Sequence, residues 1–379
     1  MPHPAIAAMP GSREPHHVPD IEPAAPRNGQ LVCKTLQLGV CGTDRDIISS
    51  GTPFLPPDEN HLILGHECLA IVEQTTEAVV NLKKGDLVVP VVRRPLNNDS
   101  DSGNDSVGGS SIAKTASESR VDMMPFGTYT ERGIVHEHGF SLNRWLDEEQ
   151  FLIPVEESMR DIVVLAEPMA VAEKAVNEAI AVQCGRLGEA WGKQGPRVLV
   201  TGMGPIGFTA LLASLARGWH TTMWGRDPKD SFRASLAQQF GAEYENSVAD
   251  QIMPADVQQD GFDLILECTG NDDVTLQAAR SLASCGVMVW LGADRRPMSK
   301  EHNVSQLMRD AIMRNHIHLG SVNAAMRDFR DAIAHLKYFQ QTKPQELDSL
   351  ITRRVTPQDA ISEYRSRTAQ SIKAVLMYD

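Results

Sequence analysis

The sequence lacks both a basic charge excess and a long hydrophobic run. Its 36 lysines and arginines stand against 49 acidic residues, which gives a net charge of -13. Because like charges repel, we expect neither nucleic acid nor an anionic membrane surface as a partner. No apolar stretch approaches the ~20 residues that span a bilayer, and residues 1–26 lack the charged-then-apolar layout of a secretion signal. The expected location is therefore the cytoplasm.

Paired cysteine spacing is also missing. The six cysteines are scattered along the chain, so we expect no disulfide framework, and each cysteine is by default a small buried side chain. The chain is long and rich in apolar residues. With 379 residues, 42% of them hydrophobic, the chain can form two domains with substantial cores.

The first part of the chain predicts a compact, mostly β fold. Runs rich in β-formers at 31–36, 69–73 and 87–90 are separated by glycines and polar turns. Residues 97–119 consist mainly of Asn, Asp, Ser and Gly, which predicts a long loop or a disordered insertion. We predict that residues 373–377 form a strand that returns to this first fold.

After Pro168 the pattern changes to alternating helices and strands. A helix is predicted to about residue 182. It is followed by predicted strands at 197–201, 220–224, 262–269 and 287–291 and predicted helices at 206–217, 231–240 and 273–283. This alternation is typical of a doubly wound parallel sheet with helices on both faces.

A glycine-rich turn follows the first of these strands. Gly202 permits a tight turn, Gly204 lets the backbone approach a pyrophosphate, and Gly207 allows close packing of the helix on the strand. The helix start at Pro205 and Ile206 offers amide donors nearby and a favourable dipole to phosphate. The pattern predicts a dinucleotide site; the alternative is a tight strand–helix turn without a ligand.

The end of the next strand bears on the choice of cofactor. NAD sites usually have Asp or Glu there, about 20 residues after the glycines, whereas here Gly225 is followed by Arg226. A guanidinium can bind a 2′-phosphate through two charge-assisted hydrogen bonds, which favours NADP over NAD. Two alternatives stay open: Asp227 could be a displaced ribose-binding acid, and Arg226 could be a solvated loop residue.

Cys41, His66 and Glu67 are candidate metal ligands. A thiolate, an imidazole and a carboxylate all bind zinc well, and three protein ligands with an open fourth position define a catalytic zinc site. Their separation in sequence does not by itself bring Cys41 to His66. A buried cysteine and a core histidine are therefore valid alternative interpretations.

Three motifs, at residues 39–44, 64–67 and 83–90, resemble the catalytic-domain motifs of zinc-dependent medium-chain dehydrogenases. A likeness to the glucose 1-dehydrogenases is carried by residues 41–47, 92–95, 129–134, 165–168 and 320–323. The resemblance extends from Gln30 to the end of the chain. It implies an α/β fold class, with a mostly-β GroES-like catalytic domain at 1–172 and 324–379 and a doubly wound, parallel-sheet Rossmann domain at 173–323.

The resemblance also implies roles for individual residues. Cys41, His66 and Glu167 would hold one catalytic zinc ion, Glu167 directly or through water. Glu67 would be an alternating ligand or a nearby base, and Thr43 would relay the proton of the substrate hydroxyl. The implied substrate contacts are Thr43, Glu131, Glu167 and Asn323. The implied cofactor contacts are Gly202, Gly204, Pro205, Ile206, Gly207, Arg226, Thr269 and Asn323.

Two departures from the family pattern are visible. Many relatives bind a structural zinc through four cysteines in the lobe after the Arg-Arg-Pro motif, but this lobe has none here, so we expect no structural zinc. Glucose-specific relatives commonly have histidine ten residues before Asn323, where this chain has Met313. The second departure puts strict glucose specificity in doubt.

The expected function is zinc-dependent hydride transfer from a sugar to NADP, the C1 hydroxyl of an aldose such as glucose being the first candidate. One alternative is a zinc dehydrogenase for another polyol or a secondary alcohol. The other is a zinc-free nucleotide-binding protein on the same fold. By analogy with the superfamily we expect a homo-oligomer, either a dimer or a tetramer, with residues 316–322 as a pairing edge.

Overall fold

The computed structural model describes residues 3–96, 118–248, 261–293, 304–368 and 370–378. The chain divides into two compact units, which are treated separately here. The first unit comprises Met1–Glu167, Asn323–Ile333 and Ile351–Asp379, and the second comprises Pro168–Val322 and Ala334–Leu350. Most of the predicted insertion at 97–119 lies outside the described residues; its last two residues begin the short helix η1 (Glu118–Met123).

The first unit is built around a seven-stranded sheet in which six strands follow the order β11-β6-β5-β3-β19-β18, and β10 also pairs with β3. The pairs are antiparallel except for the parallel pair β18–β19. These strands are β3 (Gln30–Val40), β5 (Glu67–Thr75), β6 (Leu87–Pro90), β10 (Arg144–Glu148), β11 (Leu152–Val155), β18 (Ile351–Val355) and β19 (Lys373–Met377).

Two small sheets and several short helices complete the first unit. One sheet has the order β2-β1-β4 and the other β7-β8-β9. Their strands are β1 (Ala5–Ala8), β2 (His16–Val18), β4 (Leu62–Ile63), β7 (Arg93–Pro95), β8 (Tyr129–Arg132) and β9 (His136–Glu137). The helices include α1 (Gly42–Ser50), η2 (Glu149–Phe151), η3 (Glu157–Met159), η4 (Val163–Leu165), η5 (Pro357–Asp359) and α10 (Ile361–Arg365).

The C-terminal strand β19 lies in the main sheet between β3 and β18, although more than 330 residues separate it from its partner β3. Ala374 pairs with Val40 and Leu376 with Leu38. Leu38, Ala374 and Leu376 belong to one buried apolar cluster, which explains why an apolar run at the end of the chain docks here. The strand predicted at 373–377 is therefore present and returns to the first fold.

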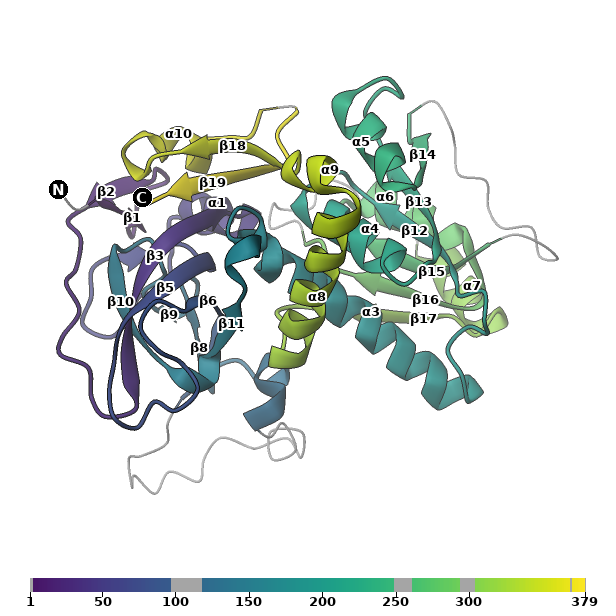
Figure 1. The fold of residues 1–379 in the computed structure, drawn as a ribbon. Coiled ribbons are helices and arrows are strands. Elements are labelled where there is room, and N and C mark those ends of the chain that lie inside the picture. Colours follow the sequence, from purple (N-terminus) through teal and green to yellow (C-terminus); the bar gives the residue numbers. More distant parts are fainter. Residues whose placement is uncertain (1–2, 97–117, 249–260, 294–303, 369, 379) are drawn as a thin grey trace. The chain divides into compact units, whose positions relative to one another are not determined.

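The second unit contains a six-stranded, fully parallel sheet in the order β14-β13-β12-β15-β16-β17 (Figure 1). Its strands are β12 (Arg197–Thr201), β13 (His220–Gly225), β14 (Glu243–Asn246), β15 (Phe262–Glu267), β16 (Leu282–Trp290) and β17 (Ile317–Gly320). This order, with helical connections, is that of a doubly wound dinucleotide-binding sheet. The predicted fold class is confirmed.

Helices connect the parallel strands. Since such crossovers are right-handed, α4 and α5 lie on one face of the sheet and α6 lies on the other. The helices are α3 (Ala166–Leu187), which begins at the end of the first unit, α4 (Pro205–Leu215), α5 (Phe232–Phe240), α6 (Asp272–Arg280), α7 (Ser305–Met313), α8 (Met326–Thr342) and α9 (Pro344–Asp348). The helix predicted at 273–283 is shorter than expected. It ends at Arg280, and the next strand, β16, begins at Leu282.

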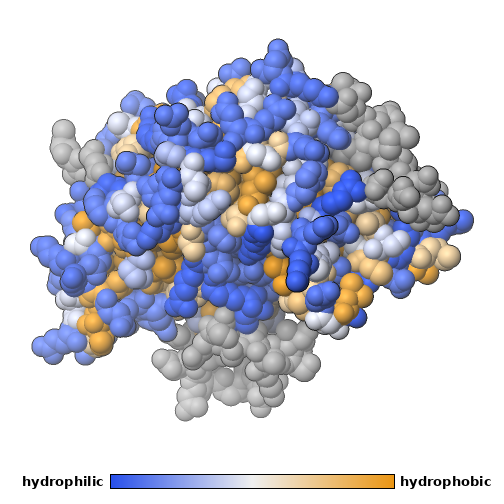
Figure 2. Space-filling view, turned by 45° about the vertical axis from the view of Figure 1, so that its right-hand side comes forward, coloured by the Kyte–Doolittle hydropathy of each residue, from blue (hydrophilic) through white to orange (hydrophobic). Residues whose placement is uncertain are grey.

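Polar residues cover most of the described part of the face that Figure 2 draws. On the face drawn in Figure 2, hydrophobic residues form separate patches among hydrophilic ones. Large exposed apolar side chains of the second unit include Ile312 and Met313, at the end of α7, and Val322. Within the part of the chain that the structure describes, no helix is long and apolar enough to cross a membrane.

Candidate active site

Strand pairing in the first unit brings the candidate metal ligands together. Because β3 and β5 are antiparallel neighbours, with Gly39 opposite Glu67, the end of β3 meets the start of β5. Cys41 follows β3, and His66 and Glu67 lie where β5 begins. Their ligand atoms all lie within 4.8 Å of one another. The sequence alone left this juxtaposition open.

Asp44 supports this cluster, and the sequence analysis gave it no role. Its side chain is fully buried in α1, and its Oδ2 accepts the backbone N–H of Cys41 at 2.9 Å. Its Oδ1 lies 3.4 Å from Nδ1 of His66. A carboxylate there favours a proton on Nδ1, so that Nε2 is left with its lone pair. The signal in the sequence was an acidic residue in the first turn after Cys41.

Burial and charge act against each other in this region. Burial alone would lower the pKa of His66, but the Asp44 carboxylate and Cys41 outweigh it and raise this pKa well above its usual value. Burial alone would raise the pKa of Asp44, yet the attraction to His66 keeps it below its usual value. A metal ion would have to displace the proton from His66, which makes metal binding weaker at low pH.

Two further predicted site residues lie in the first turns of helices near Cys41, His66 and Glu67. Thr43 is two residues after Cys41 in the chain, and Glu167 has His66 and Glu67 as charged neighbours. Glu167, in the first turn of α3, is 9% exposed. Burial raises its pKa to about 7, with His66 and Glu67 as charged neighbours acting in opposite directions. Thr43, in the first turn of α1, is partly exposed. A carboxyl group that titrates near neutral pH can accept a proton in a reaction.

A buried lysine, Lys373, lies beside Glu67, and the sequence analysis did not identify it. Lys373, the first residue of β19, is 1% exposed, and its Nζ donates to Glu67 Oε1 at 2.6 Å and also contacts Oε2. The local signal was a single charged residue at the start of an otherwise apolar C-terminal strand. Its partner, 306 residues earlier, had no sequence signature.

Glu131 and Asn323, both predicted substrate contacts, are in direct contact in the first unit. Asn323 Nδ2 donates to Glu131 Oε1 at 2.6 Å. Arg93 donates to the same oxygen from Nε at 3.0 Å and approaches it with Nη2 at 2.9 Å. Three donors therefore converge on Oε1. Among the described residues, no hydrogen bond involves Oε2.

The glycine-rich turn lies at the carboxyl end of the second unit's sheet. Gly202 has a left-handed φ of 89°, and a Cβ on Gly207 would overlap the carbonyl of Gly202, so both positions require glycine. Gly204 caps α4, which starts with Pro205 and Ile206. The order β13-β12-β15 places this turn where the connections diverge, the usual position of a bound dinucleotide.

Thr269 follows β15, the neighbour of β12, and therefore lies beside Gly202: a Cβ on Gly202 would be 2.9 Å from Thr269 Cγ2. The buried carboxylate of Glu267 shapes this loop. It accepts hydrogen bonds from Thr201 Oγ1 at 3.1 Å and from the amides of Thr269 and Gly270 at 2.8 and 3.1 Å. Like Asp44 in the first unit, Glu267 holds a predicted site residue in place, and no sequence motif marks it.

The end of β13 has three distinctive features. Gly225 is buried, and a Cβ there would overlap the side chain of Met203, so an acidic side chain at this position would require Met203 to move. Asp227 is engaged by Arg233 through two contacts of 2.7 Å. Arg226 is exposed, with no hydrogen bond or ion pair from its guanidinium to any described residue.

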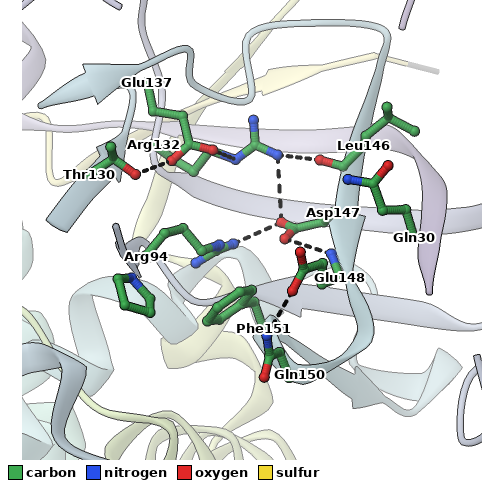
Figure 3. A pocket seen from close by; sticks show the side chains of 11 residues that line it. Gln30, Arg94, Thr130, Arg132, Glu137, Leu146, Asp147, Glu148, Gln150 and Phe151 are labelled. Atoms are coloured by element: carbon green, nitrogen blue, oxygen red, sulfur yellow. Dashed lines mark hydrogen bonds and ion pairs between the residues drawn. The ribbon is translucent and has the colours of Figure 1, made fainter. Parts of the chain in front are cut away.

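A separate polar pocket of about 260 Å³ lies in the first unit (Figure 3). Arg94 and Arg132 point from two sides toward Asp147, at 2.7 and 3.6 Å. Arg132 is also paired with Glu137 at 3.2 Å. None of the candidate metal ligands lines this pocket, and its charges compensate one another, so we assign it no chemistry.

Comparison with known families agrees with this architecture. Residues 27–142 match the alcohol dehydrogenase GroES-like domain, and residues 160–378 match the glucose dehydrogenase C-terminus. The molecule is thus a dehydrogenase of the class that joins a GroES-like domain to a dinucleotide-binding domain.

Within that class, the chain belongs to the glucose dehydrogenase family. It is 33% identical to glucose 1-dehydrogenase 1 of Caldivirga maquilingensis and 34% identical to glucose 1-dehydrogenase of Thermoproteus tenax, each over 98% of both chains. A structure of Haloferax mediterranei glucose dehydrogenase in complex with NADP, Zn and gluconolactone matches with a TM-score of 0.82 and 27% identity, over 99% of both chains. The resemblance noted from the motifs is confirmed.

The raised pKa of Glu167 predicts a pH-dependent stability of the metal-free protein. The folded state holds this proton up to about pH 7, whereas an unfolded glutamic acid releases it near pH 4.3. Stability from this group is therefore present at low pH and is lost as the pH rises from about 4.5 to 7, by on the order of 1–3 kcal/mol.

Chemical denaturation of metal-free wild type and Glu167→Gln at several pH values measures this difference. The variant should lose less stability than wild type over that interval. Glu189→Gln, at an exposed position, is the matched control and should follow wild type. Parallel curves for wild type and Glu167→Gln would show that burial does not hold the proton on Glu167.

Proposed function

We propose that this protein is a zinc- and NADP-dependent dehydrogenase that oxidises the C1 hydroxyl of an aldose such as glucose. The observation that carries the proposal is the convergence of Cys41, His66 and Glu67 within 4.8 Å in the GroES-like unit. Glu167 nearby, and a glycine-rich dinucleotide turn in the second unit, support it. This combination disfavours the alternative of a zinc-free nucleotide-binding protein.

The donor set fits one catalytic zinc ion. A thiolate, an imidazole and a carboxylate are suitable ligands, and Asp44 supplies the second-layer partner that zinc-bound histidines usually have. We assign Cys41 and His66 as its ligands, together with the carboxylates of Glu67 and Glu167, of which Glu67 lies in the cluster and Glu167 would bind directly or through water. When bound, zinc acts as a Lewis acid that lowers the pKa of a hydroxyl group. No cysteine occurs between Cys68 and Cys184, which supports the absence of a structural zinc.

The chain's own residues would manage the proton and the hydride. Thr43, partly exposed in the first turn of α1, is our candidate for passing the hydroxyl proton outward. When bound, the nicotinamide would accept the hydride of the C1–H bond, so the aldose would lose one hydride and one proton and become a lactone. The H. mediterranei relative, in its complex with gluconolactone, supports this product class.

Glu131 and Asn323 are our candidates for sugar recognition. With Oε1 of Glu131 already accepting from Arg93 and Asn323, Oε2 is the oxygen available to a further donor. An ionised carboxylate only accepts hydrogen bonds, so it selects a hydroxyl group rather than an apolar or carbonyl group. A polyol or another sugar remains the second candidate, because Met313 stands where glucose-specific relatives have histidine and is 75% exposed at the end of α7.

Three features at the end of β13 favour NADP. Gly225 lacks the acid that binds an NAD ribose, Met203 packs where such a side chain would begin, and the charge of Asp227 is compensated by Arg233. The ion pair with Arg233 disfavours the alternative of Asp227 as a displaced ribose ligand. Arg226 is left exposed beside them, with its donors available to a 2′-phosphate. We assign Thr269 and Asn323 as further cofactor contacts.

A homo-oligomer and a cytoplasmic location stay predictions. The edge strand β17 has one unpaired side within the described sheet, and exposed apolar side chains at Ile312 and Val322 flank it in sequence. Unpaired strand edges and exposed apolar groups are features of association surfaces. Light scattering of the purified protein measures the oligomeric state, and a monomer at assay concentration would contradict the proposal.

The proposed activity predicts about one zinc ion per chain and reduction of NADP in the presence of an aldose. Metal analysis and a substrate panel of aldoses, polyols and secondary alcohols test it. Cys41→Ala should lose both the zinc and the turnover, whereas Cys184→Ala, at an exposed position, should keep both. Absence of zinc together with no turnover on any substrate would contradict the proposal; turnover of polyols alone would favour the second candidate.

Glu131→Gln tests the substrate contact. A hydrogen bond to a charged group contributes about 1.5–3 kcal/mol, so KM for the sugar should rise about tenfold or more, with KM for NADP unchanged. Because Glu131 is buried beside Arg93, circular dichroism and the melting temperature must first show that the variant is folded. An unchanged KM for the sugar in a folded variant would remove Glu131 from the substrate site.

Arg226→Ala tests the cofactor assignment. Loss of a charge-assisted phosphate contact should raise KM for NADP about tenfold or more and leave KM for NAD nearly unchanged. Arg280→Ala replaces another exposed arginine of the second unit, at the end of α6, and should change neither constant. Equal effects of Arg226→Ala on both cofactors would refute a phosphate contact.

A further inference from the structure

A buried carboxylate lies at the carboxyl end of the second unit's sheet. Glu267 is the last residue of β15 and is 1% exposed. Its Oε1 accepts hydrogen bonds from Thr201 Oγ1 at 3.1 Å and from the amide of Thr269 at 2.8 Å, and it also contacts Thr269 Oγ1. Its Oε2 accepts the amide of Gly270 at 3.1 Å. Among the residues that the structure describes, no cationic side chain forms an ion pair with this carboxylate.

These hydrogen bonds are those of an ionised carboxylate. Each oxygen of Glu267 accepts a backbone N–H, and such donors stabilise the charged form of a buried carboxyl group. Burial, and after it the charge of Glu267, raises the pKa of the adjacent Cys268 thiol well above its usual value. The thiol is therefore neutral at neutral pH and adds no second charge. Glu267 thus contributes a negative charge that is stabilised by dipoles and not by a counter-ion.

The ends of three neighbouring strands meet around Glu267. Thr201 is the last residue of β12 and precedes the glycine-rich turn, and Thr269 follows β15. The backbone carbonyl of Glu267 accepts hydrogen bonds from the amides of Leu291 and Gly292, which follow β16, at 2.8 and 3.0 Å. The charge therefore lies under the edge of the sheet where a dinucleotide binds in this type of fold.

The nicotinamide end of the proposed cofactor would lie on this side of the sheet. Strands β13 and β15 are on opposite sides of β12 (Figure 1). Arg226, after β13, is our candidate for the 2′-phosphate of the adenosine, and the glycine-rich turn after β12 is our candidate for the pyrophosphate. A dinucleotide lies across the crevice with one nucleotide over each half of the sheet. The nicotinamide nucleotide would then lie over β15 and β16, the strands that surround Glu267.

The two redox forms of the cofactor differ in the charge of this ring. The nicotinamide is cationic in NADP⁺ and neutral in NADPH, because the hydride that it accepts cancels its positive charge. A fixed negative charge attracts the cationic ring and has no comparable attraction for the neutral ring. Since Glu267 is buried, water and salt screen this attraction less than they screen a pair of exposed charges. The phosphates carry the same charge in both forms, so their repulsion from Glu267 does not discriminate between them.

We propose that Glu267 is a selectivity determinant for the redox state of the cofactor: its buried charge strengthens the binding of NADP⁺ relative to that of NADPH. The inference rests on the proposed function, because it presupposes a nicotinamide cofactor that extends from β13 to β15. An enzyme that oxidises a sugar takes up the oxidised form and releases the reduced form. A shift in this direction therefore favours both the first binding step and the last release step.

The ratio of the dissociation constants, Kd for NADPH divided by Kd for NADP⁺, tests the inference. Isothermal titration calorimetry of the purified protein without sugar measures both constants. In Glu267→Gln the amide oxygen can take the place of Oε1 with its donors, while the NH₂ group faces the amide of Gly270. The charge is lost and most of the hydrogen bonds are kept. We expect the ratio to fall about fivefold or more, whereas a loop that was only loosened would bind both forms less tightly and leave the ratio unchanged.

Three control variants separate the charge from the structure. Glu267→Asp keeps the charge and should retain the wild-type ratio, even where both constants rise. Thr201→Val removes one hydrogen bond to Glu267 without removing the charge, and it too should retain the ratio. Glu243→Gln removes an exposed charge at the amino end of β14 in the same sheet and should change neither constant. An unchanged ratio in folded Glu267→Gln would overturn the inference.

Thr269 provides the deciding variants if Glu267→Gln does not fold. This side chain is exposed in the loop that Glu267 holds. Thr269→Lys brings a positive charge next to the Glu267 carboxylate and should lower the ratio relative to Thr269→Met, which removes the hydroxyl group without adding a charge. Equal ratios in the two Thr269 variants would also overturn the inference, because a charge at the end of β15 would then not reach the nicotinamide ring.

Failure of the proposed function has a different signature. A wild-type protein that binds neither redox form of NADP or NAD would refute the nicotinamide cofactor itself, and there would be no ratio to compare. If the protein prefers NAD, the same ratio is measured with NAD⁺ and NADH. A wild-type protein that oxidises a sugar, with a ratio that Glu267→Gln does not change, would refute only the role of Glu267.

Discussion

Strand β3 is held between β5 and β19, and the candidate metal site depends on both of these pairings. The pairing with β5 sets Gly39 against Glu67, so that Cys41 at the end of one strand meets His66 at the start of the other. The pairing with β19 brings Lys373 to the same end of the sheet. A shift of register by one residue on either side would turn Glu67 or Lys373 to the opposite face. The chemistry of the site is thus a consequence of sheet register.

Three carboxylates lie buried in this region, and each is accommodated in a different way. Asp44 accepts a backbone N–H and lies against His66, which keeps its pKa low. Glu67 is paired with Lys373. Glu167 is stabilised by its own proton, since burial raises its pKa to about 7. Close like charges in a low-dielectric region cannot all be ionised without compensation. The carboxyl group with the weakest compensation is therefore the one suited to exchange a proton near neutral pH.

The sequence predicted those features that are encoded within a few neighbouring residues. The apolar strand and glycine-rich turn around Gly202 and Gly207 specify their own conformation, and the strand at 373–377 was placed correctly. What depends on long-range contacts was not accessible. In the sequence, Lys373 is a single charged residue at the start of an apolar strand. Its ion pair with Glu67 is visible only in the folded structure. The helix predicted to reach residue 283 ends earlier because Leu282 joins the sheet beside Phe262, and tertiary pairing overrides local propensity there.

Packing at the end of β13 bears on the choice between NADP and NAD, which the motif leaves open. From the sequence, Arg226 favours NADP, and Asp227 leaves a displaced ribose-binding acid as the alternative. Arg233 donates two hydrogen bonds to the Asp227 carboxylate and compensates its negative charge. Asp227 is therefore less able to bind a ribose hydroxyl and repels a nearby phosphate less. Met203 fills the space beside Gly225 that a ribose-binding acid would need. Cofactor preference in this chain is thus argued from two side chains, Arg233 and Met203, that belong to no cofactor motif.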